Sequence, residues 1–423
     1  VDRNDLCPSD YGGDWWLSSY IPAGSRNTVR EGERDLGSGC AADLAWRTTT
    51  GRFDVIVVLA DTGINWADDD YQRNVALNTA ELPLPQTADG QESLSYDLDG
   101  NGLVNITDYA QDPRVSLSAG VERADSMLDA SDLIYTFSDG VDDDGNGFAD
   151  DIAGWDFFQN DNDAYTSYFE GFGDHGGGVA EDMVSEGGAG SGGHIGVCPG
   201  CSLLPLRIAD SIVSDGGRVA QAMVYAADRG ASAMSMATGA INSPDYLQTA
   251  VAYAESKGVV MVGAAGDENA YHHNFPSVLD GILYVHSVTA PADEYNGAYS
   301  YFNIWNCNNW GPRLQLVAAS SACATGAVAV TTGSAGLIKS AGRDNGLDLT
   351  AQEVYQLLAQ TADDVWLSEV GVPTLCGYLP LGRGLGPLLR LRSRERGPCG
   401  CAGERRGDPA HRHHLLALLV SGH

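Results

Sequence analysis

The chain has 423 residues, of which 43% are hydrophobic, so we expect a globular protein with one or two large cores. Its net charge of −33 argues against nucleic acid as a partner, because phosphates are bound by Lys and Arg, and it favours a secreted protein with oxygen ligands for calcium. No apolar run of about 18 residues is present, so no membrane span is predicted.

Short apolar runs alternate with helical patterns from residue 52 onward. Four runs are predicted to be strands buried on both faces of a sheet: 55–60, 202–208, 258–266 and 282–288. Three segments carry apolar residues at helical spacing: 218–230, 245–258 and 350–362. The last begins with Thr350 and Glu353, which have the spacing of a capping box. Strands that alternate with helices indicate an α/β fold with a parallel sheet.

Composition divides the chain into a lead segment (1–50), a folded body (51–379) and a tail (380–423) with eight Arg against three acidic residues. No fold is assigned to the tail. It is either a basic anchor for an acidic surface or an out-of-frame translation of Arg-rich coding sequence. The chain begins at Val1 without a basic and then apolar leader, so we expect that a signal peptide was removed.

Nine cysteines are too few for a disulfide scaffold. Cys198-Pro-Gly-Cys201 has the spacing of a redox pair, half a zinc site or a local disulfide. No second pair of this spacing completes a zinc site, so a structural bridge in an oxidising compartment is favoured. Two further pairings are considered, although sequence alone does not fix connectivity: Cys307 with Cys323, and Cys7 with Cys40.

Two polar side chains in glycine-containing segments are candidates for catalysis. Asp61 follows the apolar run 55–60, and the carboxyl end of a buried parallel strand is where α/β sheets place their chemistry. His175 lies in the stretch GDHGGG, before a segment of helical character. Taken alone, Asp61 could simply mark the end of a strand, and His175 could be an ordinary loop histidine. The stretch GAAGD (263–267) and a small-residue helix start at 323–340 follow them, and the combination is more specific.

In this order and context the chain resembles the subtilisin-like serine proteases, the subtilase or peptidase S8 family. The stretch DTGI (61–64) matches the family's Asp motif, and DHG (174–176) matches its His motif. Residues 234–236 take the place of its substrate-binding stretch, and the resemblance covers about residues 50–365. It implies a subtilisin-like three-layer fold over 51–379, with a mainly parallel central sheet and helices on both faces.

The resemblance also implies a secreted or periplasmic endopeptidase, expected to be a monomer, that acts on a peptide or protein in its cleft. Asp61 would orient His175, and His175 would take the proton of a nucleophilic hydroxyl and return it to the leaving amine. Residue 267 and backbone amides would hold the oxyanion.

Two positions depart from the family pattern. Asp267 stands where the family has Asn, and an ionised carboxylate cannot donate a hydrogen bond to an oxyanion. A gapless alignment places Thr325 in the slot of the nucleophilic Ser, whereas a shifted alignment places Ala322 there. The extra methyl group of Thr restricts χ1 and crowds the path of attack. The sequence therefore leaves open whether the chain is an enzyme.

Two acidic loops in an insertion at about 66–173 are predicted to bind calcium, with a solvated turn as the alternative. In 97–108 oxygen ligands recur as in a 12-residue calcium loop, namely Asp97, Asp99, Asn101, the Leu103 carbonyl, Asn105 and Asp108. The segment 142–151 repeats half of the pattern, with Asp142, Asp144, Asn146, Asp150 and Asp151.

Three hypotheses follow from these features. The first is a secreted, calcium-stabilised endopeptidase. The second is an inactive relative, a pseudoprotease, that still binds peptides in the cleft. The third is a calcium-dependent adhesion or scaffold module that uses the same fold.

Overall fold

The computed structural model describes residues 15–20, 38–117, 127–166, 174–187, 194–289, 303–304, 307, 309–311, 313–320, 322–366 and 389–392. Its strands are β1 (Ile56–Asp61), β2 (Trp155–Asp156), β3 (Ser202–Arg207), β4 (Val213–Ser214), β5 (Ala233–Met236), β6 (Gly239–Ala240), β7 (Val260–Ala264), β8 (Ile282–Thr289), β9 (Asn303–Ile304), β10 (Leu316–Ala319), β11 (Asp363–Trp366) and β12 (Leu389–Arg392). Its α-helices are α1 (Ala42–Ala45), α2 (Ala130–Phe137), α3 (His175–Val184), α4 (Gly216–Asp228), α5 (Asp245–Ser256), α6 (Ala324–Asp344) and α7 (Ala351–Thr361).

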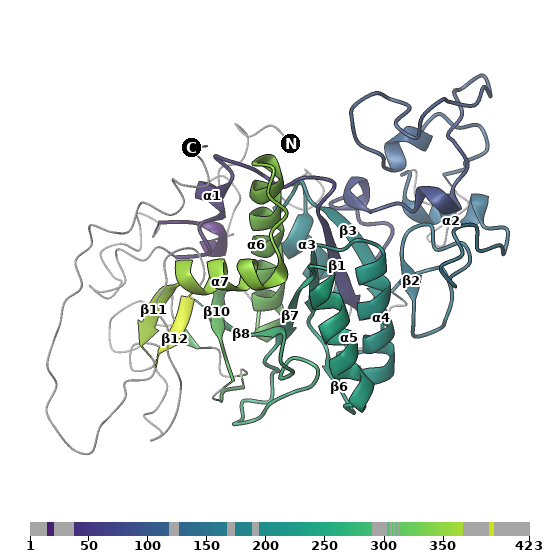
Figure 1. Cartoon of the computed structure of the whole chain (residues 1–423). Coiled ribbons are helices and arrows are strands. Elements are labelled where there is room, and N and C mark those ends of the chain that lie inside the picture. The colour runs from purple at the N-terminus through teal and green to yellow at the C-terminus, as the bar shows by residue number, and fades with distance from the viewer. Residues whose placement is uncertain are drawn as a thin grey trace, which may run out of the picture.

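The main sheet has the strand order β11-β12-β10-β8-β7-β5-β1-β3-β2, and β9 pairs with β8 (Figure 1). From β10 to β2 every neighbouring pair is parallel. The pairs β10–β12 and β8–β9 are antiparallel. The predicted α/β fold with a mainly parallel sheet is confirmed.

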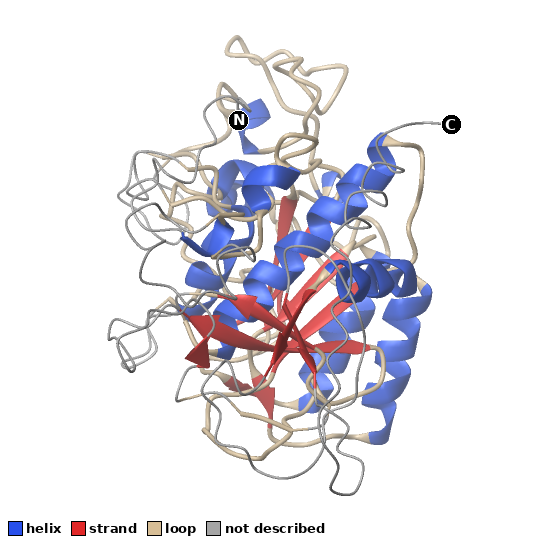
Figure 2. Ribbon diagram, turned by 90° about the vertical axis from the view of Figure 1, so that its left-hand side faces the viewer, coloured by secondary structure: helices blue, strands red, loops and turns tan. Residues whose placement is uncertain are grey.

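Alternate side chains of β1 point into two hydrophobic cores, one on each face of the sheet. Val57 and Leu59 belong to the core that α3, α6 and α7 cover, and Val58 and Ala60 belong to the core under α4 and α5. All four side chains are fully buried. A strand buried on both faces needs apolar residues at every position, which is why β1 is a continuous apolar run. The expected helices on both faces are therefore present (Figure 2).

The predicted helices form as α4, α5 and α7. The capping box at α7 is also present: the Thr350 side chain accepts a hydrogen bond from the Glu353 amide, and the Glu353 carboxylate accepts one from the Thr350 amide. These two bonds satisfy donors that the start of any helix leaves unpaired.

Strand β1 lies at the point where the order of strands reverses. Its neighbours are β3 on one side and β5 on the other. The chain therefore passes from β1 to β3 on one side, and the next strand of the main sheet, β5, lies on the opposite side of β1. Open α/β sheets bind ligands in the crevice at the carboxyl ends of the strands at such a point. Asp61 is the last residue of β1 and therefore lies where this fold positions a site.

The described residues between β1 and α3 form mostly loops and short helices, among them η3 (Gln72–Asn74), η4 (Thr79–Glu81) and η5 (Ile106–Tyr109), at one side of the molecule (Figure 1). They return to the sheet as β2, which pairs with β3. In the tail, where no fold was assigned, four residues form β12 and pair with β10 and β11. The rest of the tail and most of the lead segment lie outside the described residues.

Candidate active site

Asp61 and His175 come together at the carboxyl edge of the sheet, although 113 residues separate them in the sequence. The Asp61 carboxylate lies 2.6 Å from Nδ1 of His175 and is fully buried. The same carboxylate oxygen accepts a hydrogen bond from the Thr62 amide at 2.7 Å. The negative charge of Asp61 is the main reason that the pKa of His175 is raised, and burial opposes this effect.

The first turn of α3 holds His175 against the end of β1. The Asp174 side chain caps the helix by accepting a hydrogen bond from the Gly177 amide, and the Thr62 hydroxyl accepts one from the Gly176 amide. A Cβ atom at position 176 would lie 2.0 Å from the Gly63 carbonyl oxygen, so only glycine permits this approach. Close packing of α3 on the end of β1 therefore requires a glycine at position 176.

Thr325 is the second residue of α6 and faces the other nitrogen of the same imidazole. Its Oγ1 lies 3.5 Å from Nε2 of His175, at the outer limit of a hydrogen bond. The side chain is half-buried. Asp61, His175 and Thr325 thus stand in one line: carboxylate, imidazole, hydroxyl. In structures without substrate, contacts of this kind are often long.

Asp267 follows β7 and lies against the same helix start. Its Oδ1 accepts a hydrogen bond from the Ala324 amide at 3.0 Å. Burial is the main reason that its pKa is raised, and the charge of Glu268 adds to the effect. Asp267 and His175 also interact electrostatically, so all four sequence-predicted catalytic residues occupy one site.

Two of the three considered disulfides are formed. Cys198 pairs with Cys201, and Cys307 pairs with Cys323 directly before α6. Cys40 is a buried free thiol, and Cys7, the partner considered for it, lies outside the described residues.

The first predicted calcium loop brings three of its carboxylates together. One oxygen atom from each of Asp97, Asp99 and Asp108 lies within 4.8 Å of the other two. Asp108 forms a capping box with Asn105 at the start of η5 and also accepts hydrogen bonds from the Leu98 and Asp99 amides. The remaining predicted ligands, Asn101 and the Leu103 carbonyl, are in the same loop, whose Leu103 amide donates to the Asn101 side chain.

The second predicted loop contributes only part of its acids to a cluster. Asp144 and Asp151 group with Glu81, which the sequence analysis did not identify because it lies far from the loop in the chain. Asp150 lies apart from this group, because its carboxylate accepts hydrogen bonds from the amides of Asp139 and Gly140. Asp142 accepts from the Asn146 and Gly147 amides.

A third acidic group, Asp68, Asp70 and Glu181, was also missed. Its residues come from the segment after β1 and from α3, so no contiguous pattern in the sequence predicts the group. Burial raises the pKa of Glu181 to about 7, and the neighbouring Asp68 acts in the same direction.

Comparison with known proteins shows which family the chain belongs to. The sequence pattern of the subtilase family, peptidase S8, matches residues 53–378. The chain belongs to the subtilase family. Thermitase from Thermoactinomyces vulgaris is 30% identical over 223 residues, which are 51% of this chain and 74% of thermitase.

Other relatives match over smaller parts of their length. Fervidolysin from Fervidobacterium pennivorans is 28% identical, over 60% of this chain and 36% of its own. The halolysin-like extracellular serine protease Nep from Natrialba magadii is 28% identical, over 39% of this chain and 28% of its own. The chain thus spans about a third of these two relatives. Among solved structures, sphericase shares 17% identity with a TM-score of 0.47, over 75% of this chain and 85% of that one.

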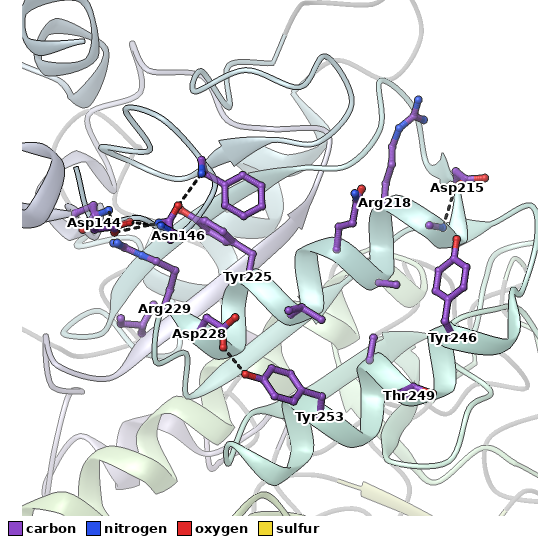
Figure 3. A pocket seen from close by; sticks show the side chains of 18 of the residues that line it. Asp144, Asn146, Asp215, Arg218, Tyr225, Asp228, Arg229, Tyr246, Thr249 and Tyr253 are labelled. Atoms are coloured by element: carbon purple, nitrogen blue, oxygen red, sulfur yellow. Dashed lines mark hydrogen bonds between the residues drawn. The ribbon is translucent and has the colours of Figure 1, made fainter. Parts of the chain in front are cut away.

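The described structure also has a surface pocket of about 1160 Å³ (Figure 3). Side chains of α4 and α5 line it, among them Arg218, Tyr225 and Tyr253, together with Asp144 and Asn146 of the second acidic loop. None of the four candidate catalytic residues contributes to it. Within the described part of the chain, no helix is both long and apolar enough to cross a membrane.

Proposed function

We propose that this subtilase is a serine-type endopeptidase in which Thr325 occupies the place of the nucleophile. The observation that carries the proposal is the line of Asp61, His175 and Thr325, with contacts of 2.6 Å and 3.5 Å on the two sides of one imidazole. The substrate is a peptide or protein that lies at the carboxyl edge of the sheet, next to this line.

In the proposed mechanism the Asp61 carboxylate accepts a hydrogen bond from Nδ1–H of His175, which keeps the proton on Nδ1 and leaves Nε2 free to act as a base. Nε2 takes the proton of the Thr325 hydroxyl as Oγ1 attacks the peptide carbonyl carbon, and it later gives that proton to the leaving amine. The Oγ1–Nε2 contact must shorten from 3.5 Å when substrate binds. The γ-methyl group of Thr325 restricts this rotation, which lowers the rate.

The oxyanion that forms in this step meets the start of α6, whose backbone dipoles place partial positive charge there. Asp267 is beside it, but as a carboxylate it accepts a hydrogen bond from Ala324 rather than donating one. Loss of one oxyanion donor typically lowers kcat by about 10²–10³, a magnitude known from a subtilase. We therefore expect weak activity from the native chain.

The pH dependence of peptide hydrolysis tests this function. His175 must be neutral to act as a base, and its pKa is raised, so the rate should rise only above the pH at which a free histidine loses its proton. Asp267 can donate to an oxyanion only while it is protonated, below its own pKa.

Replacing Asp267 by Asn removes a negative charge that helps to raise the pKa of His175. In the Asp267→Asn variant the acid limb of kcat/KM should therefore move to lower pH and the plateau should rise. Hydrolysis of a fluorogenic peptide library by the native chain and the variant measures both effects. The pH should run from about 5 to about 10, a range that covers the titration of histidine. An unchanged or upward-shifted acid limb would show that residue 267 does not act on His175.

We also propose that calcium stabilises the fold through the 97–108 loop. Asp97 Oδ1 is a buried oxygen without a hydrogen-bond partner in the described structure, which suits a ligand of a cation. Asp97, Asp99 and Asp108 would supply hard oxygen ligands. The Glu81, Asp144 and Asp151 group fits less well, because the side chains of Asn78, Asn146 and Tyr225 already donate hydrogen bonds to its carboxylates.

Calcium should raise the Tm of the chain, because an ion that binds only the native state stabilises it by about 2.7 kcal/mol at 100 times its Kd. Asp99→Asn should lose most of this increase while its Tm in chelator changes little, since Asp99 is exposed. Glu92→Gln, a charge-neutralising change at another exposed acid of the same insertion, is the matched control and should keep the full increase. Scanning calorimetry with and without calcium measures these changes in Tm. If calcium does not change the Tm of the native chain, the proposed calcium site is wrong.

We further propose a secreted protein, with residues 51–379 as the peptidase domain and 66–173 as an insertion that calcium holds in place. The acidic composition and the two disulfides support an oxidising, extracellular location. The Nep protease, whose name describes it as extracellular, is a relative.

A pseudoprotease that binds peptides is the second candidate function. The carboxylate of Asp267 at the oxyanion position and the methyl group of Thr325 favour it. In that case the chain would bind peptides without cleaving them, and restoring the family's residues at 267 and 325 would restore cleavage.

A further inference from the structure

The disulfide between Cys307 and Cys323 lies at the start of the helix that carries Thr325. Cys323 is the capping residue immediately before α6, and Thr325 is two residues further on. Between them, the Ala324 amide donates a hydrogen bond to Asp267. Any displacement of Cys323 therefore moves the hydroxyl of Thr325 and the partner of Asp267 together.

The other end of the bridge is fixed to the loop of Asp267. The Cys307 carbonyl accepts a hydrogen bond from the Asn269 amide at 2.9 Å. Two residues on, the Asn309 amide donates to the Gly266 carbonyl at 3.0 Å, and the Asn309 side chain accepts from the Ala270 amide at 3.0 Å. Asn309 is fully buried, so these bonds are shielded from water. Cys307 is thus attached to residues on both sides of Asp267.

The bridge consequently connects the two segments that carry Asp267 and Thr325. Across that junction the described structure has one hydrogen bond between the segments, from Ala324 to Asp267, beside the disulfide. The Cys198–Cys201 bridge differs, because both of its cysteines are fully buried at the start of β3, whereas Cys307 and Cys323 are partly exposed. A reductant in solution should reach the former bridge far more slowly than the latter.

We infer that Cys323, through its disulfide with Cys307, is a positioning residue for Thr325 and Asp267, and that reduction of this bond by an external dithiol reversibly lowers catalytic activity. The inference rests on the proposed function of the site. In the reduction, the dithiol gives two electrons and two protons, the S–S bond breaks into two thiols, and the dithiol becomes a disulfide. Of the two links described above, the hydrogen bond from Ala324 to Asp267 then remains between the start of α6 and the Asp267 loop.

The test uses the full chain with Thr325→Ser, so that activity is easy to measure. Brief treatment with dithiothreitol, followed by alkylation and peptide mapping, shows which cysteines are reduced. We expect alkylation at Cys307 and Cys323 while Cys198 and Cys201 stay paired. The kcat should fall about 10²-fold with a smaller change in KM, because misplacement of a reacting group by about 1 Å costs this much. Reoxidation should restore the rate.

Variants separate positioning from general stability. Cys323→Ser and Cys307→Ser should each reproduce the low kcat and no longer respond to dithiothreitol. The double variant Cys198→Ser/Cys201→Ser is the matched control and should keep the kcat and its sensitivity to the reductant. Hydrogen exchange of the Ala324 amide should accelerate on reduction, while the amides of β7 should exchange as before.

The outcomes distinguish this inference from the proposed function. If no variant hydrolyses peptides but exchange at Ala324 accelerates on selective reduction, the positioning role of the Cys307–Cys323 disulfide is supported and the proposed function fails. If peptide hydrolysis is present but selective reduction changes neither kcat nor exchange at Ala324, the inference is wrong. It is equally wrong if both disulfides are reduced only when the protein unfolds.

Discussion

Restoring the family's two residues, with Thr325→Ser and Asp267→Asn in one chain, should raise the kcat of peptide hydrolysis by at least about 10²–10³-fold over the native chain. Asn in place of Asp267 turns an acceptor into a group that can also donate to the oxyanion. Ser in place of Thr325 keeps the hydroxyl that lies 3.5 Å from His175 and removes the methyl group that restricts its rotation.

Steady-state hydrolysis of one fluorogenic peptide by the native chain, both single variants and the double variant measures this gain. Thr331→Ser is the matched control: it makes the same substitution on the same helix at a fully buried position away from His175, and should leave the rate unchanged. If the double variant is no faster than the native chain, Thr325 does not occupy the nucleophile position.

Asp61→Asn should lower the kcat of the Thr325→Ser chain by about 10⁴-fold, the size of effect that loss of the triad carboxylate has in serine proteases. The Asn amide has no charge to stabilise an imidazolium, and its NH₂ group can donate to Nδ1, which leaves the imidazole in the tautomer whose Nε2 is not a base. The pKa of His175 should also fall, because the charge of Asp61 is the main cause of its raised value.

Two measurements check this prediction together. Hydrolysis rates give the loss, and the NMR titration of the His175 ring protons gives the fall in pKa. Asp280→Asn is a suitable control, because that side chain is 89% exposed and lies outside the site. A loss of less than tenfold (about 1.4 kcal/mol in the barrier) would mean that Asp61 is a structural capping group for the Thr62 amide only.

The sequence was sufficient for the features that depend on local pattern. Asp61 was predicted because a continuous apolar run ends there, and a run of that kind must be a strand buried on both faces. The His175 segment was predicted from the stretch GDHGGG before a helical pattern, which matches the family's His motif. Thr325 was placed in the nucleophile slot by a gapless alignment with the family's Ser motif, and a shifted alignment placed Ala322 there instead.

Features that join distant segments could not be predicted in the same way. Glu81 meets Asp144 and Asp151 only because η4 folds back beside the second loop, and the sequence has no periodicity that records this contact. Asp150 has the right spacing for a ligand, yet its carboxylate caps the amides of Asp139 and Gly140 instead. Strand β5 was not identified as a strand because it is only four residues long.

The most direct test of the catalytic line is the residue that an active-site fluorophosphonate modifies in the Thr325→Ser chain. A phosphonyl group should be found on residue 325 by peptide mapping, and His175→Ala should abolish the modification. The hydroxyl is unreactive unless the imidazole removes its proton, so labelling that depends on His175 requires the two groups to meet as they do here. Labelling at Ser320, or labelling at residue 325 that persists without His175, would contradict the assignment.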